Sequence, residues 1–94
     1  MIYLPLTNNP EEKFNISIFD NIYIMRQLWN TLGFWTIDIQ DSNGNVFVYG
    51  VKIVTQTRLL QPYPTIPFDL LSSDTFDPTR NTLNSFLLGV VNRV

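Results

Sequence analysis

The chain has 94 residues, which is enough for one domain with one hydrophobic core. The net charge is −2 and the six cations are scattered along the chain, so nucleic acid is disfavoured as the main partner. The absence of cysteine and histidine excludes disulfides, thiolate chemistry and the usual zinc and haem ligands.

Charged residues make up only 15% of the chain, against about 25% in an ordinary soluble domain. So few charges leave apolar surface exposed, and we expect other proteins to cover it. No apolar run approaches the about 18 residues that span a bilayer, and the start lacks the pattern of a signal peptide. We therefore expect a complete chain made in the cytoplasm, with no membrane partner.

The first hairpin is predicted from alternation and a turn signal. Apolar residues alternate with polar ones over residues 14–18, which indicates a half-buried strand. Asp20 and Asn21 tolerate the positive φ angles of a tight turn. A loop of these two residues would place Ile18 opposite Tyr23.

The returning strand, residues 22–29, is apolar on both faces. Tyr23 and Met25 continue the core face of the first strand. The other face carries Ile22, Ile24 and Leu28, with Arg26 between them. Because 94 residues leave little material to cover a sheet twice, we expect another chain to contact this second face.

The second hairpin has the clearest pattern in the chain. Residues 35–41 alternate regularly, and Asn43-Gly44 suits both central positions of a type I′ turn. The partner strand is predicted over residues 46–54, where Gly50 indicates a bulge or bend. Phe47 and Tyr49 are expected to share its face away from the core.

The remaining third is less regular. Residues 58–67 contain three prolines and are predicted to form an extended connector. A short strand is predicted over residues 66–71, followed by a polar loop at 72–82. Residues 86–94 are predicted as a last strand, with a short helical turn over 83–88 as an alternative.

These elements predict one all-β domain over residues 1–94, with an N-terminal segment at residues 1–12. Six to seven short strands with turns between them are typical of a small antiparallel β-barrel or β-sandwich.

No catalytic, metal or cofactor site is predicted. Asp38 and Asp41 are three residues apart on one strand and would point to opposite faces, so they cannot act as a carboxylate pair. Residues 41–45 resemble part of a calcium loop but lack its closing acidic residue, and a plain turn is favoured. Serine and threonine nucleophiles lack a histidine base. We therefore expect the protein not to be an enzyme and to need no cofactor.

Two classes of function remain, a protein that binds other proteins and a carbohydrate-binding module. The second would recognise a bacterial surface glycan through Trp29 and nearby aromatic residues. For the first, the candidate contact residues are Phe19, Ile22, Ile24, Leu28, Phe47 and Tyr49.

Several segments, taken in order and spacing, resemble one known family. They are Tyr3 to Leu6, Phe14 to Ile18, Tyr23 to Asn30, Trp35 to Asp41 with Gly44, Gly50 to Val54, and Leu59-Leu60. This series resembles the small plug-type baseplate proteins of contractile-tailed bacteriophages, the cyanophage-like baseplate plugs. The likeness covers about residues 3 to 63, and the Asp/Thr-rich loop beyond residue 64 matches less closely.

The resemblance implies a structural, non-enzymatic protein of the virion tail baseplate, with no catalytic residues to transfer. Its implied partners are other tail proteins of the hub, tube or spike, met in several copies of a symmetric assembly. Low charge and a strand apolar on both faces point independently to a subunit whose burial is completed by a neighbour.

Overall fold

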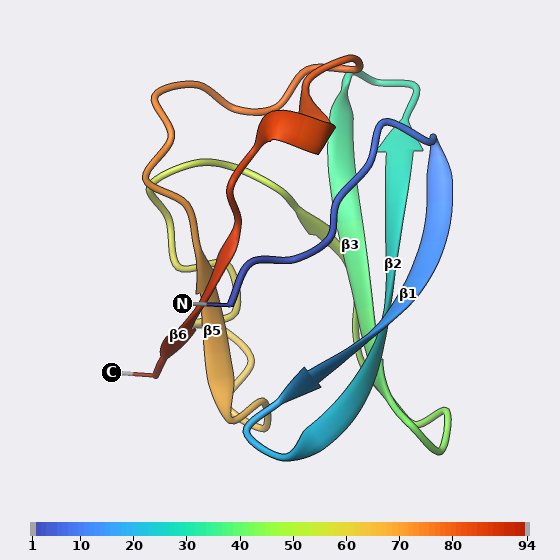
Figure 1. Cartoon of the computed structure of the whole chain (residues 1–94), viewed down its shortest axis with the longest axis vertical. Helices are drawn as coiled ribbons and strands as arrows, with labels where there is room; N and C mark the ends of the chain where they lie inside the picture. The colour runs from blue at the N-terminus through green and yellow to red at the C-terminus, as the bar shows by residue number, and fades with distance from the viewer. Residues whose placement is uncertain (1, 94) are drawn as a thin grey trace.

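Two antiparallel sheets make up the protein, in a computed structural model that describes residues 2–93 (Figure 1). The protein is all-β, which confirms the predicted class, and neither sheet closes on itself within these residues. The elements in chain order are β1 (Glu11–Ile18), β2 (Asn21–Asn30), β3 (Phe34–Asp41), β4 (Val46–Lys52), β5 (Phe68–Leu71), a 3-10 turn (Leu83–Ser85) and β6 (Gly89–Asn92).

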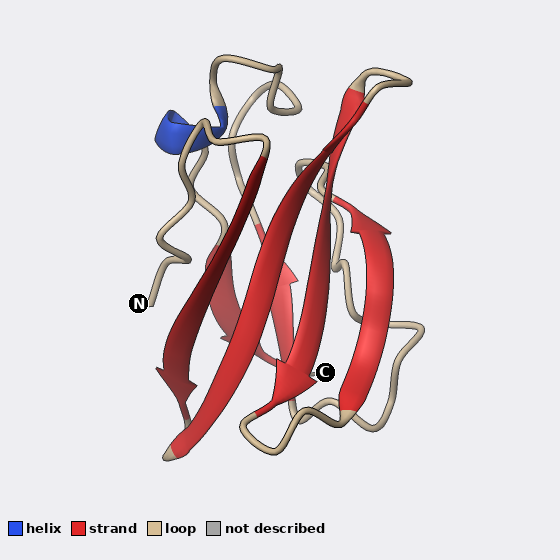
Figure 2. Cartoon of the chain, turned by 90° about the vertical axis from the view of Figure 1, so that its right-hand side faces the viewer, coloured by secondary structure: helices blue, strands red, loops and turns tan. Residues whose placement is uncertain are grey.

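The larger sheet joins β1 to β4 in chain order through three hairpins (Figure 2). The smaller sheet pairs β5 with β6. The N-terminal segment lies along the free edge of β6, where Tyr3 bridges Gly89 and the N–H of Val90 donates to the carbonyl of Ile2 at 2.8 Å. Residues from opposite ends of the chain are therefore neighbours.

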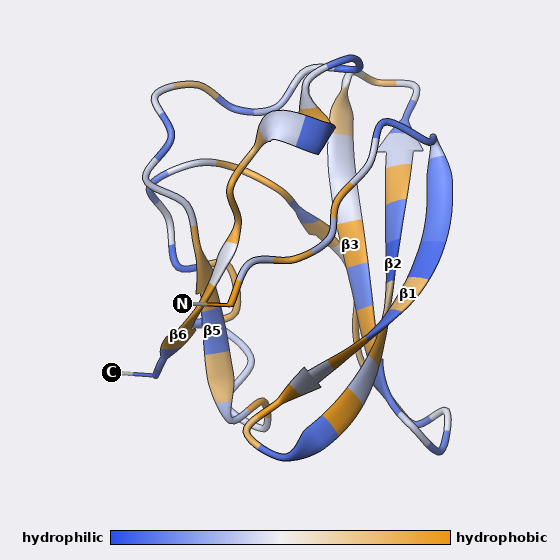
Figure 3. Ribbon diagram, viewed as in Figure 1, coloured by the Kyte–Doolittle hydropathy of each residue, from blue (hydrophilic) through white to orange (hydrophobic). Residues whose placement is uncertain are grey.

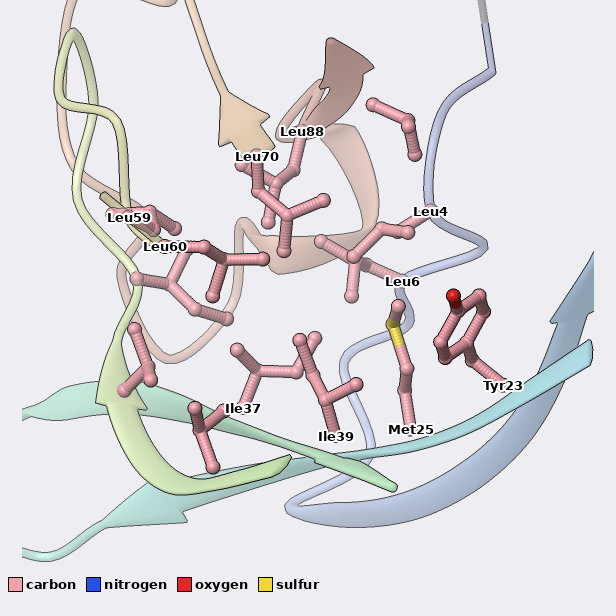
Figure 4. Packing of buried hydrophobic residues seen from close by; sticks show 14 of the residues in the cluster. Leu4, Leu6, Tyr23, Met25, Ile37, Ile39, Leu59, Leu60, Leu70 and Leu88 are labelled. Carbon is pink, nitrogen blue, oxygen red and sulfur yellow. The ribbon is translucent and has the colours of Figure 1, made fainter. Parts of the chain in front are cut away.

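The core lies between the two sheets because alternate residues of each strand point to the same side. Hydrophobic and polar residues alternate along part of β3 (Figure 3), whereas β2 carries apolar residues on both faces. Met25 and Ile39 of the larger sheet face Leu70 and Leu88 from the other side, and Leu4 of the N-terminal segment fills the space between them (Figure 4). Each of these five side chains is at most 5% exposed.

Polar groups tie the loops to this core. Trp35 is fully buried, and its indole N–H donates to the carbonyl of Thr79 at 2.8 Å. Gln27 is also fully buried, and its amide exchanges hydrogen bonds with the backbone of Thr7. The amide also donates to the carbonyl of Asn9 at 2.7 Å. These bonds satisfy buried polar groups and fix the N-terminal segment on β2.

The first hairpin differs from its predicted register. Ile18 pairs with Asn21 and Ile16 with Tyr23, so the predicted pairing of Ile18 with Tyr23 is wrong by two residues. The loop consists of Phe19 and Asp20, at φ 50° and 68°, as in a type I′ turn. A shift by two residues keeps the same side chains on the core face, so the predicted face is right.

The second hairpin also turns differently. Asp41 N–H donates to the carbonyl of Asn45, which leaves three residues in the loop. Gly44 has a φ of 87° and Asn43 is not among the residues at positive φ. The predicted type I′ turn at Asn43-Gly44 is therefore wrong, and Gly44 alone takes the left-handed conformation.

The last third of the chain contains more turns than expected. Residues 58–67 form successive turns rather than an extended connector, and Leu60 and Ile66 are fully buried in the protein's own core. The predicted short strand before the polar loop appears as β5. Both readings of the C-terminus are found, since the 3-10 turn at 83–85 precedes the strand β6.

Candidate functional site

Five of the six candidate contact residues, all but Phe47, lie on or beside the outer face of the larger sheet, the face opposite the core. Paired residues on neighbouring strands point to the same side, so the register defines this face. Its most exposed apolar side chains are Ile22 of β2, at 54%, and Tyr49 of β4, at 67%. Ile24 lies between them along the sheet and is half-buried. We call Ile22, Ile24 and Tyr49 the outer patch.

A charged ladder crosses the same face beside the outer patch. Arg26 donates to Asp38 through Nε at 3.1 Å and Nη2 at 2.8 Å, and through Nη1 to Glu11 at 3.1 Å. The hydrogen bond to Asp38 is the main cause that raises the pKa of the Arg26 guanidinium. Leu28 lies beyond this ladder, so Arg26 separates it from the outer patch.

The carboxylate of Asp38 also shapes β4. Its Oδ1 accepts a hydrogen bond at 2.7 Å from the N–H of Gly50, whose φ of 69° marks a bulge between the pairs Ile37–Val51 and Ile39–Val48. The extra residues of a bulge bend the strand and redirect a side chain. Tyr49 is the residue redirected here, and it stands beside Ile24 and Arg26 at a hollow of about 120 Å³.

Phe19 occupies the tip of the β1–β2 hairpin and is 50% exposed. A bulky residue at positive φ is unfavourable, because its Cβ approaches the backbone. Phe19 is not paired in the sheet, so the register does not place it on the outer patch. It lies in the turn at the end of the sheet, three residues before Ile22 in the chain.

Phe47 does not lie where the sequence placed it. A second irregularity in the β3–β4 register turns its ring toward the core, where it packs on Tyr23 with ring centroids 5.9 Å apart. Its predicted place on the outer face is therefore wrong. The strict alternation used to predict it fails because a bulge inserts one residue into β4.

A second exposed apolar surface was missed by the sequence reasoning. Tyr3 and Leu87 are 48% and 52% exposed, and with Leu71 and Val91 they line a hollow of about 150 Å³ on the smaller sheet. The signal was present in the alternation from Tyr3 to Leu6, where Leu4 and Leu6 are buried. The pairing of this segment with β6 joins residues 86 positions apart, and no local pattern predicts it.

The carboxylate of Asp41 acts as a turn residue, as expected. It accepts hydrogen bonds from the side chain of Asn45 and the backbone of Asn45 and Asn43. These bonds, that of the Asn45 side chain first, lower the pKa of the Asp41 carboxyl below its ordinary value. Over residues 2–93 the structure brings together no group of three or more metal-ligating side chains.

Trp29, named for the alternative of a glycan site, packs against another aromatic ring. Trp29 is half-buried and packs edge-to-face on Trp35, with ring centroids 5.3 Å apart.

In the part of the chain described, the protein contains no helix with the length and apolarity to traverse a bilayer.

The fold and its surfaces define a small all-β protein with exposed apolar side chains on the outer face of the larger sheet and beside the smaller sheet, as well as in its turns. Comparison with protein families identifies it further. The family model described as cyanophage baseplate Pam3 plug gp18 matches residues 1–92, and the chain belongs to this family. The match extends past the residues 3 to 63 that carried the resemblance in the sequence. No curated protein matches the chain. Membership supports a structural role in a phage baseplate.

Proposed function

We propose that the protein is a non-enzymatic plug of a phage tail baseplate that holds neighbouring tail subunits by protein–protein contacts. The observation that carries this proposal is the family match over residues 1–92. The protein would be made in the host cytoplasm and incorporated into the virion tail in several copies. Its partners would be proteins of the hub, tube or spike.

The contacts would be made by the outer patch together with Phe19 and Leu28. Exposed apolar side chains that are packed on a rigid sheet lose little conformational freedom on binding, and their burial stabilises the complex. The ladder of Glu11, Arg26 and Asp38 would set the orientation, because charged groups favour one alignment of two surfaces over others. Phe47 would support Tyr23 from the core side rather than contact a partner.

The test replaces exposed members of the outer patch in a phage whose own copy of the gene is deleted and supplied in trans. In the double variant Ile22→Asp and Tyr49→Asp, we expect at least tenfold less of the protein in purified tails, measured by quantitative mass spectrometry. Both side chains are more than half exposed, so the isolated variant should keep its fold by circular dichroism.

The matched control is Leu32→Asp. Leu32 is 84% exposed in the turn between β2 and β3, at the opposite end of β2 from Ile22. This control should enter tails as the unchanged protein does. Normal incorporation of the double variant would refute the role of the outer patch, and absence of the unchanged protein from purified tails would refute the proposed function itself.

A further inference from the structure

The strand β1 forms an open sheet edge that differs from every other edge in the described structure. It pairs with β2 alone, over eight residues without a bulge. The edge of β4 is interrupted by two register irregularities. The outer edge of β5 is occupied by residues 56–59, which bond to Leu70 and Ser72, and that of β6 by the N-terminal segment. Bulges, covering segments and charged side chains are the usual protection against strand addition. β1 has no bulge and no covering segment, and its charges are confined to its first three residues, Glu11 to Lys13.

The backbone groups that this edge offers follow from the hairpin. In a two-residue hairpin the closing pair, here Ile18 and Asn21, exchanges hydrogen bonds, and such pairs alternate along the ladder. The hydrogen bond from the N–H of Trp29 to the carbonyl of Pro10 fits the same alternation, since Pro10 is also even-numbered. Even-numbered residues of β1 therefore bond to β2. The N–H and carbonyl groups of Lys13, Asn15 and Ser17 point to the open edge.

The side chains of β1 divide cleanly between the two faces. Phe14 and Ile16 lie on the core face, where they are half-buried against the cluster and keep part of their surface open at the edge. Lys13, Asn15 and Ser17 lie on the outer face and are exposed. A strand added here would complete the burial of two apolar side chains and pair with three backbone positions.

The sequence of β1 is complementary to itself in one antiparallel register. When Asn15 of one copy pairs with Asn15 of another, Phe14 faces Ile16 on the core side and Lys13 faces Ser17 on the outer side. The residues whose backbone groups point to the open edge then exchange hydrogen bonds between the two copies, Lys13 with Ser17 and Asn15 with Asn15. Phe14 and Ile16 meet as apolar partners, and the positive charge of Lys13 meets a neutral side chain. At the end of the paired segment Glu12 faces Ile18.

Neighbouring registers are less favourable. Sliding one copy by two residues toward Glu11 places Glu12 against Ile16, and a further two residues place Lys13 against Lys13, where like charges repel. Sliding in the other direction pairs Ile16 with Ile16 and Phe14 with Ile18, but it places Lys13 against Phe19, outside the strand. It also sets Glu12 against Asp20, where like charges repel. The register centred on Asn15 combines two Phe14–Ile16 pairs with no like charges opposite each other.

We propose that β1 pairs antiparallel with β1 of a second copy of this chain, about a two-fold axis at Asn15. The two larger sheets then form one continuous sheet, and the outer patches of both copies lie on the same side of it. The inference concerns the purified protein and does not depend on the proposed function.

The test measures the dimerisation constant by sedimentation equilibrium. Asn15→Pro removes an N–H that β2 does not use, so the β1–β2 ladder should survive while the open edge loses its central donor. We expect dimerisation to weaken at least tenfold. Asn15→Thr keeps the N–H and serves as the matched control, with the dimerisation constant changed less than threefold, and circular dichroism reports whether each variant is folded.

Charge variants test the register independently of proline. Ser17→Glu sets a carboxylate opposite Lys13 in both halves and should tighten dimerisation several-fold at low salt, whereas Ser17→Lys should weaken it by a similar factor. In the register shifted by two residues, Ser17 would face Glu11 and the two effects would change sign.

A monomeric protein over the concentration range from micromolar to millimolar would overturn the proposal. A monomer whose Asn15→Pro variant alone is missing from tails would assign the edge to a strand of another baseplate protein instead, which also overturns pairing with a second copy. A change of sign in the Ser17 variants would overturn the register centred on Asn15.

Discussion

Phe19 adopts a backbone conformation that lowers the stability of the isolated protein. Its φ of 50° lies in the left-handed region, which costs a non-glycine residue roughly 1–2 kcal/mol. Half of its side chain is exposed, so burial inside the domain offsets little of this cost. An unfavourable conformation retained at an exposed apolar residue is what a contact with a partner would explain.

We expect Phe19→Asn to raise the free energy of unfolding by about 0.5–1 kcal/mol, because asparagine adopts the left-handed region readily. Urea unfolding of the purified protein measures the change. The same variant should enter tails less well, since it loses the apolar ring.

Phe19→Ala separates the two effects. Alanine removes the ring but keeps the backbone strain, so tail entry should fall without a gain in stability. A Phe19→Asn protein that unfolds at lower urea than the unchanged one would contradict the strain argument.

At the level of elements, the sequence predicted the strands of the larger sheet and the faces of β1, β2 and β3, but not their registers. Alternation has a period of two residues, so it cannot distinguish the pairing of Ile18 with Asn21 from that with Tyr23. Asp20 is part of both the predicted turn, Asp20-Asn21, and the observed turn, Phe19-Asp20. Contacts across the sheet decide between the two. The charged ladder was missed for the same reason, since Arg26 and Asp38 are paired by the register.

The bulge in β4 limited the prediction of the candidate contact residues. Gly50 signalled an irregularity, but the second one, beside Phe47, carries no glycine or proline and left no mark in the sequence. The alternation placed Ile22, Ile24 and Leu28 correctly because β2 is regular, and it placed Tyr49 correctly because Tyr49 still follows the buried Val48. Their role as contacts stays a prediction.

The bulge should depend on the backbone of Gly50 rather than on space around it. A Cβ added at Gly50 would meet no atom within 4 Å, but the φ of 69° disfavours any side chain. We expect Gly50→Ala to lower the free energy of unfolding by about 1 kcal/mol, measured in thermal or urea unfolding.

Gly50→Asn is the matched comparison, because asparagine tolerates positive φ and should lose less. Equal losses for alanine and asparagine would indicate that the cost arises from something other than the left-handed backbone.

At the scale of the whole molecule, the N-terminal segment joins the two sheets. It bonds to β6 through Ile2 and Tyr3, fills the core with Leu4, and meets β2 through Gln27. These contacts link residues distant in sequence, so composition and alternation could not predict them. The segment was expected only as a stretch preceding the first strand.

Gln27→Ala should therefore destabilise the whole fold rather than one hairpin. It leaves the N–H of Thr7 and the carbonyls of Thr7 and Asn9 without their partner, and we expect a loss of about 3 kcal/mol in urea unfolding.

Gln40→Ala, on the outer face of β3, is the control and should change the free energy of unfolding by about 0.5 kcal/mol or less. A similar loss for both variants would show that the bonds to the N-terminal segment contribute little.

The pairing of residues 2–4 with β6 also brings the described ends of the chain together (Figure 1). Neighbouring ends are what circular permutation requires, since a short peptide can connect them without strain. New ends opened at Leu32, in an exposed turn, would leave β1, the outer patch and the core contacts of the N-terminal segment uncut. A rearranged gene of this kind would move the attachment point of a fused label to the far end of the larger sheet.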